Sequence, residues 1–122
     1  MIVDNFLTEM AKAMNGESTN MPSHLAYGST TMTISTDTSS ITGELGSRDS
    51  ITGARTTNVV TFNGLKSGST VGSSGETLFT FSLWNSSGSG DLHSAVLVPS
   101  ILHTSSFDID TDWQFTVTRV ST

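Results

Sequence analysis

The sequence predicts a mainly β fold, namely a single antiparallel β-sandwich or partly closed barrel of about five to seven strands with one N-terminal amphipathic helix. Three observations support this prediction. Segments that alternate between apolar and polar residues recur along the chain, turns rich in Ser, Gly and Asn separate them, and helical periodicity is confined to the start of the chain. We therefore expect a covering or docking helix over residues 1–16 and one β-domain over residues 17–122.

The N-terminal segment has the spacing of an amphipathic helix. Ile2, Phe6 and Met10 recur at intervals of four residues, and Leu7 lies beside Phe6. The Asn-Gly pair at 15–16 is a typical helix end, because both residues tolerate the left-handed conformation. Two roles fit this helix: it covers one end of its own β core, or it inserts into a neighbouring subunit as an assembly helix through these four apolar side chains.

The first half of the predicted β-domain holds two strands. Residues 24–27 (HLAY) form the first strand, and residues 54–65 form the second. Between them, residues 29–42 are hydroxyl-rich and alternate weakly, which fits either an edge strand or an ordered loop. Glu44 and Arg48 lie four residues apart, and we expect a solvated turn there with an ion pair of well under about 1 kcal/mol.

The sequence pattern of the second half of the chain predicts a β-hairpin. Residues 76–85 (ETLFTFSLWN) carry apolar side chains on both parities, which is typical of a strand buried between layers. Residues 86–90 (SSGSG) form the turn, and residues 91–99 return antiparallel until Pro99 ends the strand. We assign the apolar side chains on one face of the first arm to the core: Phe79, Phe81 and Leu83.

The last strand is predicted over residues 107–120 (FDIDTDWQFTVTRV), and its length makes it the strand to which other strands dock. Alternation gives it one apolar face and one acidic face. The core residues predicted on the apolar face are Trp113, Phe115 and Val117. The acidic face carries Asp108, Asp110 and Asp112. These carboxylates are weak candidates for binding a hard cation, and the alternative is a solvated row of charge that discourages edge-to-edge pairing of strands.

Composition and charge argue against several classes of function. The chain has eleven acidic and five basic residues and a formal net charge of −6, which argues against nucleic-acid and anionic membrane partners. It contains no cysteine, its three histidines lie at no metal-ligand spacing, and it has no G-x-S-x-G nucleophile elbow. We therefore expect no cofactor, no metal ion and no enzymatic activity.

The apolar share of 34% predicts a thin core, and therefore a protein that gains stability by assembling with copies of itself. The N-terminus lacks the cationic start of a signal peptide, so we expect synthesis in the cytoplasm of the producing cell. Trp84 lies beside a Ser- and Gly-rich loop and could stack on a sugar ring, although core packing is the simpler interpretation.

A series of short motifs runs through the chain in a fixed order. The segment PSHLAYGS begins at Pro22, and the hydroxyl-rich stretch after it ends in Glu44 and Arg48. A Thr-Phe pair follows at 61–62, within a predicted strand.

The most specific part of the series is residues 82–99 (SLWNSSGSGDLHSAVLVP), a Gly-rich hairpin with an apolar return strand. A His-Thr pair at 103–104 and the alternating residues 112–117 (DWQFTV) close the series. In this order and spacing, nearly the whole chain resembles a family of small structural proteins of tailed phages and related viruses. The chain departs from the family pattern at His93 and His103, where basic residues are usual.

The resemblance implies a location in the virion and a non-enzymatic structural role. It points to an oligomeric component associated with the tail, the baseplate or the fibres, built from copies of itself together with other virion proteins. It implies no catalytic residues. A capsid decoration protein with the same fold is the second hypothesis, and a carbohydrate-binding module that uses Trp84 and the acidic face is the third.

Overall fold

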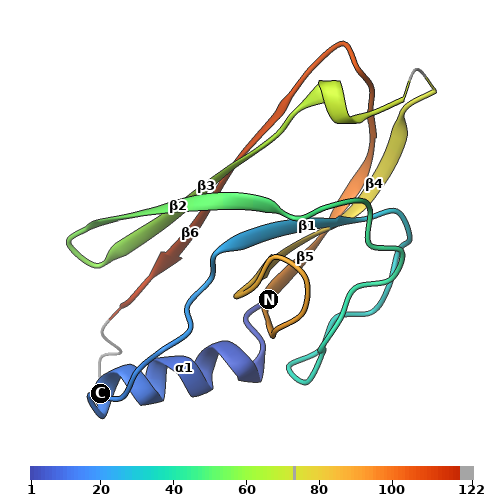
Figure 1. Cartoon of the computed structure of the whole chain (residues 1–122). Coiled ribbons are helices and arrows are strands. Elements are labelled where there is room, and N and C mark those ends of the chain that lie inside the picture. Colours follow the sequence, from blue (N-terminus) through green and yellow to red (C-terminus); the bar gives the residue numbers. More distant parts are fainter. Residues whose placement is uncertain (73, 119–122) are drawn as a thin grey trace.

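The computed structural model describes residues 1–72 and 74–118 of the chain (Figure 1). Within them lie one α-helix, one short 3-10 turn and six β-strands. Their bounds are α1 Asp4–Met14, β1 His24–Gly28, β2 Asp49–Thr56, β3 Val59–Lys66, η1 Gly68–Thr70, β4 Glu76–Trp84, β5 Leu92–His103 and β6 Ile109–Thr116. The predicted fold class, a mainly β domain with one N-terminal helix, is therefore confirmed.

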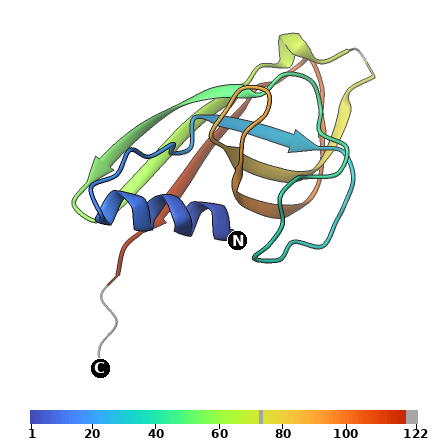
Figure 2. The same cartoon turned by 60° about the horizontal axis from the view of Figure 1, so that its bottom comes forward.

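All six strands belong to one antiparallel sheet with the order β5-β4-β1-β2-β3-β6. The sheet curls into a nearly closed barrel, in which β2, β3 and β6 form one wall and β1, β4 and β5 form the other (Figures 1 and 2). β5 and β6 are the two edges of the sheet, and in the described part of the chain no ladder of hydrogen bonds joins them. We call the opening between these two strands the seam.

Two hydrophobic cores lie on opposite faces of the sheet. The inner core fills the barrel and consists of Leu25, Tyr27, Leu78, Phe81 and Leu83. The outer core consists of Val3, Ala26, Ile41, Trp84, Leu92 and Ala95. The long segment between β1 and β2 packs on the outer core through Met32 and Ile34, so this segment is an ordered loop and not a strand. β4 contributes to both cores, which confirms that it is buried between two layers.

The predicted strand over residues 54–65 is in fact parts of two strands, because this region contains the hairpin of β2 and β3. The two strands run antiparallel up to the pair of Thr56 and Val59. Between them, Thr57 takes a left-handed conformation (φ 53°), which lets the chain reverse within two residues. Most side chains of β2 are exposed, so this strand lacks the apolar alternation that would reveal it in the sequence.

Pro99 does not end β5, contrary to the prediction, because β5 continues to His103. Three residues around Pro99 lie opposite the single residue Phe79 of β4, so the register shifts there by a bulge. Proline fits a bulge in an edge strand, since no neighbouring strand needs its missing N–H group. At the bulge, the side chains of β4 no longer alternate regularly between the two faces of the sheet. Phe79 is therefore half-buried and belongs to neither core, contrary to its predicted place in the core.

β6 is an edge strand that pairs only with β3, so it is not the strand to which the others dock. Its extent of eight residues is shorter than predicted, and residues 119–120 of the predicted strand lie outside the described residues. Trp113 and Phe115 are half-buried and pack against the inner core. Val117 follows the end of the strand and is 62% exposed, so its assignment to the core is wrong.

Arg48 is fixed by many contacts, and the prediction of a solvated turn with a weak ion pair is wrong. Its guanidinium donates twice to the Glu44 carboxylate, at 3.0 and 3.2 Å. It also donates to the carbonyl oxygens of Ser86 (3.0 Å) and Ser89 (2.8 Å), and its Cζ lies 3.7 Å from the ring centre of Trp84. The Arg48 side chain is only 6% exposed, so this cation ties the β4–β5 hairpin loop to the segment that precedes β2.

We expect Leu83→Ala to destabilise the fold strongly. Leu83 is fully buried in the inner core, and truncation of such a leucine costs about 2–5 kcal/mol. Leu65→Ala is the matched control, because Leu65 on β3 is 51% exposed and its truncation should cost less than about 0.5 kcal/mol. Urea unfolding followed by circular dichroism measures both losses, and equal losses would contradict this position of the inner core.

We expect Arg48→Lys to lower the free energy of unfolding by about 1–3 kcal/mol, although the charge is kept. An ammonium group cannot reproduce the paired bonds to Glu44, the two bonds to the hairpin loop and the contact with the Trp84 ring. Arg55→Lys is the control, since Arg55 is exposed and donates to the carbonyl oxygen of Thr57 alone among the described residues. The same urea experiment measures both variants, and an unchanged Arg48→Lys protein would show that the hairpin loop does not depend on this cation.

Candidate functional site

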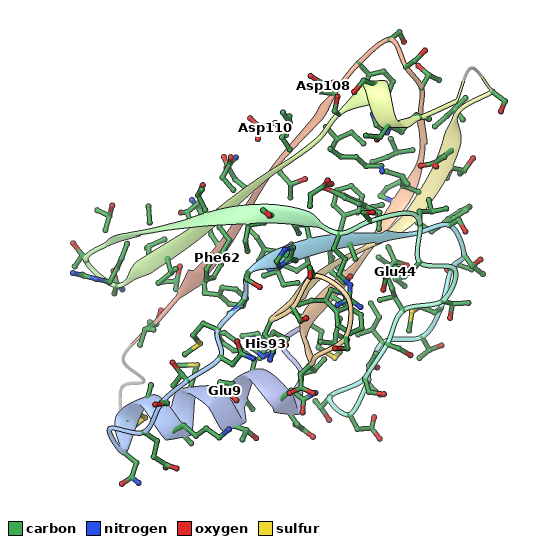
Figure 3. The ribbon with its side chains drawn as sticks, viewed as in Figure 1. Glu9, Glu44, Phe62, His93, Asp108 and Asp110 are labelled. Carbon is green, nitrogen blue, oxygen red and sulfur yellow. The ribbon has the colours of Figure 1, made fainter. Side chains whose placement is uncertain are left out.

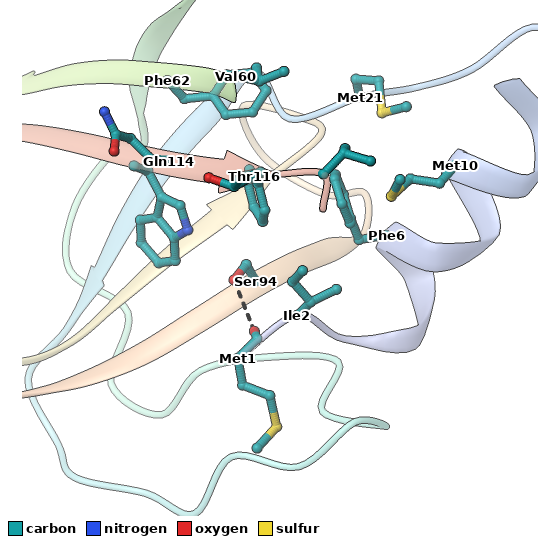
Figure 4. A pocket seen from close by; sticks show the side chains of 13 residues that line it. Met1, Ile2, Phe6, Met10, Met21, Val60, Phe62, Ser94, Gln114 and Thr116 are labelled. Carbon is teal, nitrogen blue, oxygen red and sulfur yellow. Dashed lines mark hydrogen bonds between the residues drawn. The ribbon is translucent and has the colours of Figure 1, made fainter. Parts of the chain in front are cut away.

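An apolar pocket of about 630 Å³ lies at the seam, between α1, the end of β6 and the segment that leads into β1 (Figure 4). Its volume is within the range of ordinary ligand-binding sites. The aromatic residues of its lining are Phe6, Phe62, Trp113 and Phe115, and the polar ones are Ser94, Gln114 and Thr116. No side chain of the lining is charged, which is notable in a chain with a net charge of −6.

Phe6 holds α1 over the seam. Its buried ring stacks on Phe115 of β6, with the centroids 4.7 Å apart and the planes at 17°. The same ring meets the His93 imidazole of β5 edge-on, at a centroid distance of 5.6 Å. One side chain of the helix therefore contacts both edge strands, and α1 lies beside both of them in Figures 1 and 2. This contact fits the first predicted role, in which the helix covers its own β core.

Residues 1–3 extend the sheet beyond β5. The N–H group of Val3 donates to the His93 carbonyl oxygen at 3.1 Å, and the N–H group of Ala95 donates to the Met1 carbonyl oxygen at 3.0 Å. The Ser94 hydroxyl donates to the same Met1 oxygen at 2.9 Å, the dashed line in Figure 4. Only a short part of the free edge of β5 is covered in this way.

Glu9, labelled on α1 in Figure 3, holds the chain that follows the helix against α1. Its Oε2 accepts a hydrogen bond from the backbone N–H of Asn20 at 2.7 Å, and its Oε1 accepts one from Lys12 Nζ at 3.0 Å. These two donors, the Asn20 N–H group first, hold the pKa of Glu9 below its ordinary value of 4.5. Because Met21 follows Asn20 directly, the contact positions Met21 at the pocket.

His93 is fully buried beneath α1, and its environment disfavours the imidazolium form. Its Nε2 lies 3.5 Å from Asn85 Nδ2, and its Nδ1 has no hydrogen-bond partner among the described residues. Burial lowers the pKa of His93 below its ordinary value of 6.5, and the carboxylates of Glu9 and Asp91 offset part of this effect. A neutral imidazole is therefore the form that packs against Phe6.

Four of the five methionines of the chain gather on this side of the molecule. Met1, Met10 and Met21 line the pocket, and Met14 lies one helical turn beyond Met10 and is 88% exposed. Leu7 of α1 is also exposed. We call the pocket lining together with Leu7 and Met14 the methionine-rich face. Flexible thioether side chains are over-used at surfaces that adapt to a binding partner.

The groove continues along the seam away from α1. A second pocket of about 350 Å³ shares Met1, Trp113 and Gln114 with the first pocket. It extends to Val96 on β5 and Thr111 on β6, so both edge strands contribute to its walls. The seam is therefore one open groove rather than a closed contact between strands.

The acidic row lies along β6 and the residue before it, and neighbouring groups of the chain hold its carboxylates. Asp108 accepts a hydrogen bond from the N–H of Gly68 at 2.7 Å. Asn63 Nδ2 donates to both Asp110 (2.7 Å) and Asp112 (2.9 Å). Across residues 1–72 and 74–118, no three His, Cys, Asp or Glu side chains are grouped so that they could hold a metal ion. The row fits the alternative interpretation, in which charge protects an edge strand from pairing.

The ring of Trp84 is not accessible for stacking on a sugar. It is 4% exposed, its Nε1 donates to Ser82 Oγ at 2.9 Å, and the Arg48 guanidinium covers its ring. Stacking on a sugar requires an open aromatic face. The carbohydrate-binding hypothesis therefore loses the residue on which it was based.

A polar cluster surrounds Tyr27 inside the barrel. Lys66 Nζ lies 5.1 Å from the centroid of the Tyr27 ring and 3.7 Å from Glu76 Oε2. Burial first, and then the Asp49 carboxylate, raises the pKa of Tyr27 to about 12. Burial also raises the pKa of Asp49, against the opposing effect of Lys66. These four groups come from four strands, so no sequence spacing could have predicted their contact.

The sequence identified part of the methionine-rich face. Of the predicted assembly residues, Phe6 is buried against the seam, Ile2 and Met10 line the pocket, and Leu7 is exposed beside it. Met21 was missed, because it lies in a polar loop with no periodic pattern around it. Trp113, Phe115 and Val117 were predicted only as core residues, and no site role was predicted for Val60 and Phe62 of β3.

Neither protein-family models, nor curated proteins, nor solved structures show a match to this chain. No helix within the described residues is long and apolar enough to cross a membrane. Function is therefore inferred from the methionine-rich face and from the series of motifs.

We expect the protein to lose stability as the pH falls below about 6.5, and His93 to cause this loss. The unfolded chain binds a proton near the ordinary histidine pKa, whereas the folded chain binds it only at lower pH, so acid favours the unfolded state. Urea unfolding between about pH 7.5 and pH 5.5, above the carboxylate range, measures this slope. His93→Gln should flatten it. His24→Gln, which leaves His93 in place, should keep it, and a slope that survives in His93→Gln would contradict the assignment.

Proposed function

We propose that this protein is a non-enzymatic structural component of the virion of a tailed virus, and that it works as an assembly of its own copies together with other virion proteins. The observation that carries the proposal is the methionine-rich face, a pocket of about 630 Å³ without charged side chains in its lining and with exposed apolar side chains beside it. Apolar surfaces of this kind on a soluble domain mark sites of interaction. The order of the sequence motifs supports the assignment to a virion.

The groove is better suited to a protein partner than to a small ligand. A specific small-molecule site needs a few polar groups aimed at the ligand. The polar lining here is Ser94, Gln114 and Thr116, and the Ser94 hydroxyl is already engaged by the Met1 carbonyl oxygen. The adjoining exposed residues of α1 would also stay uncovered if only a small molecule filled the groove.

A tail, baseplate or fibre-associated position is the first choice, because the motif series resembles proteins of that group. A capsid decoration protein would use the same fold and the same face. Immunogold labelling of purified particles of the encoding virus tests the proposal. Label on the tail or its appendages is the expected result, label on the head would replace the tail assignment with the decoration role, and particles without label would overturn the virion role.

A further inference from the structure

We infer that the groove of the methionine-rich face receives helix α1 of a second copy of this chain. The inference rests on the proposed function, because it names the surface through which copies assemble. It commits to one occupant, a second copy, and three observations on the described residues point to it: a stripe on α1, the position of the groove beside that stripe, and the distribution of charge.

The first observation is a stripe of apolar side chains on α1. Leu7, Ala11 and Met14 are exposed and follow the spacing i, i+4 and i+7, which places them on one face of the helix. The buried side chains of α1, Phe6 and Glu9, lie on a different face, so the stripe takes no part in holding the helix to its own barrel. This spacing is the one through which an amphipathic helix binds in an apolar groove.

The second observation is that the stripe and the groove share an edge. Met10 lines the pocket, where Figure 4 shows it on α1. It lies three residues after Leu7, so it stands between the stripe and the groove. Each copy therefore presents both halves of one interface. Two copies related by a two-fold axis can insert each stripe into the groove of the other, which buries both halves at once.

The third observation concerns charge. Each copy has a net charge of −6, so most contacts between copies bring like charges together, whereas the lining of the 630 Å³ pocket beside α1 has no charged side chain. Exposed Asp4 begins α1 and half-exposed Lys12 lies in its last turn. Lys12 Nζ is held by Glu9 Oε1 at 3.0 Å, away from the stripe. The stripe of Leu7, Ala11 and Met14 carries no charge itself, so the stripe and the groove can meet without bringing like charges together.

Sedimentation velocity over a concentration series tests the interface with three variants. Leu7→Lys alters the stripe and keeps a good helix former, and Val117→Lys alters the 62% exposed wall of the groove. Leu65→Lys is the control, because Leu65 is 51% exposed on β3 and Leu7 is 53% exposed. We expect a wild-type dimer, an increase of at least about tenfold in the dissociation constant for the first two variants, and no change for the control. Circular dichroism verifies that each variant is folded.

The absence of cysteine allows a second test in the same protein. A Leu7→Cys chain mixed with a Val117→Cys chain should form a disulfide-linked heterodimer on mild oxidation, and a Leu65→Cys chain mixed with the Val117→Cys chain should not. The inference is overturned by a wild-type monomer, by association that both charged variants leave unchanged, or by a monomer that binds an apolar fluorescent dye in the groove without associating. Each of these outcomes leaves the virion role to be judged by the immunogold labelling alone.

Discussion

The unpaired seam between β5 and β6 is the constraint on which the rest of the structure depends. Six antiparallel strands curl almost into a barrel, yet the described edge strands share no backbone ladder. An open sheet exposes N–H and C=O groups that can pair with other chains, a problem that only full closure removes. Both edges are protected in different ways. Residues 1–3 pair with one end of β5 and the bulge at Pro99 distorts the middle, while the acidic row lies along β6.

Side chains of α1 cover the seam where the backbone leaves it open. The Phe6 ring touches Phe115 on one edge and His93 on the other, so the position of the helix and the form of the barrel depend on each other. Apolar residues make up only 34% of the chain and are divided between the inner core, the outer core and this face. The thin core and the surface that we propose for assembly therefore have one origin, since apolar side chains around the seam stay exposed in a single copy.

Local periodicity of the sequence predicted the helix and those strands that have a buried face. The helix, β1, and the β4–β5 hairpin with its buried Phe81 and Leu83 follow this rule. β2 was not predicted as a separate strand, because most of its side chains are exposed and its sequence does not alternate. Val117 was predicted in the core because the alternation of the sequence continues past the end of β6. The contacts of Arg48 with the hairpin loop, some 38 and 41 residues away, and the pocket itself were beyond prediction, since both join segments that only the folded sheet brings together.

Native-state amide hydrogen exchange of β6 in dilute solution tests the open seam most directly. The Val117 N–H donates to Asn58, so alternation along β6 sets which amides face β3 and which face the seam. The amides directed at β3 are those of Thr111, Trp113 and Phe115, and the amides directed at the seam are those of Asp112 and Gln114. The structure predicts slow exchange in the first group and fast exchange in the second. Equal protection of both groups would mean that a hydrogen-bonded neighbour already closes the barrel, and would contradict the open seam.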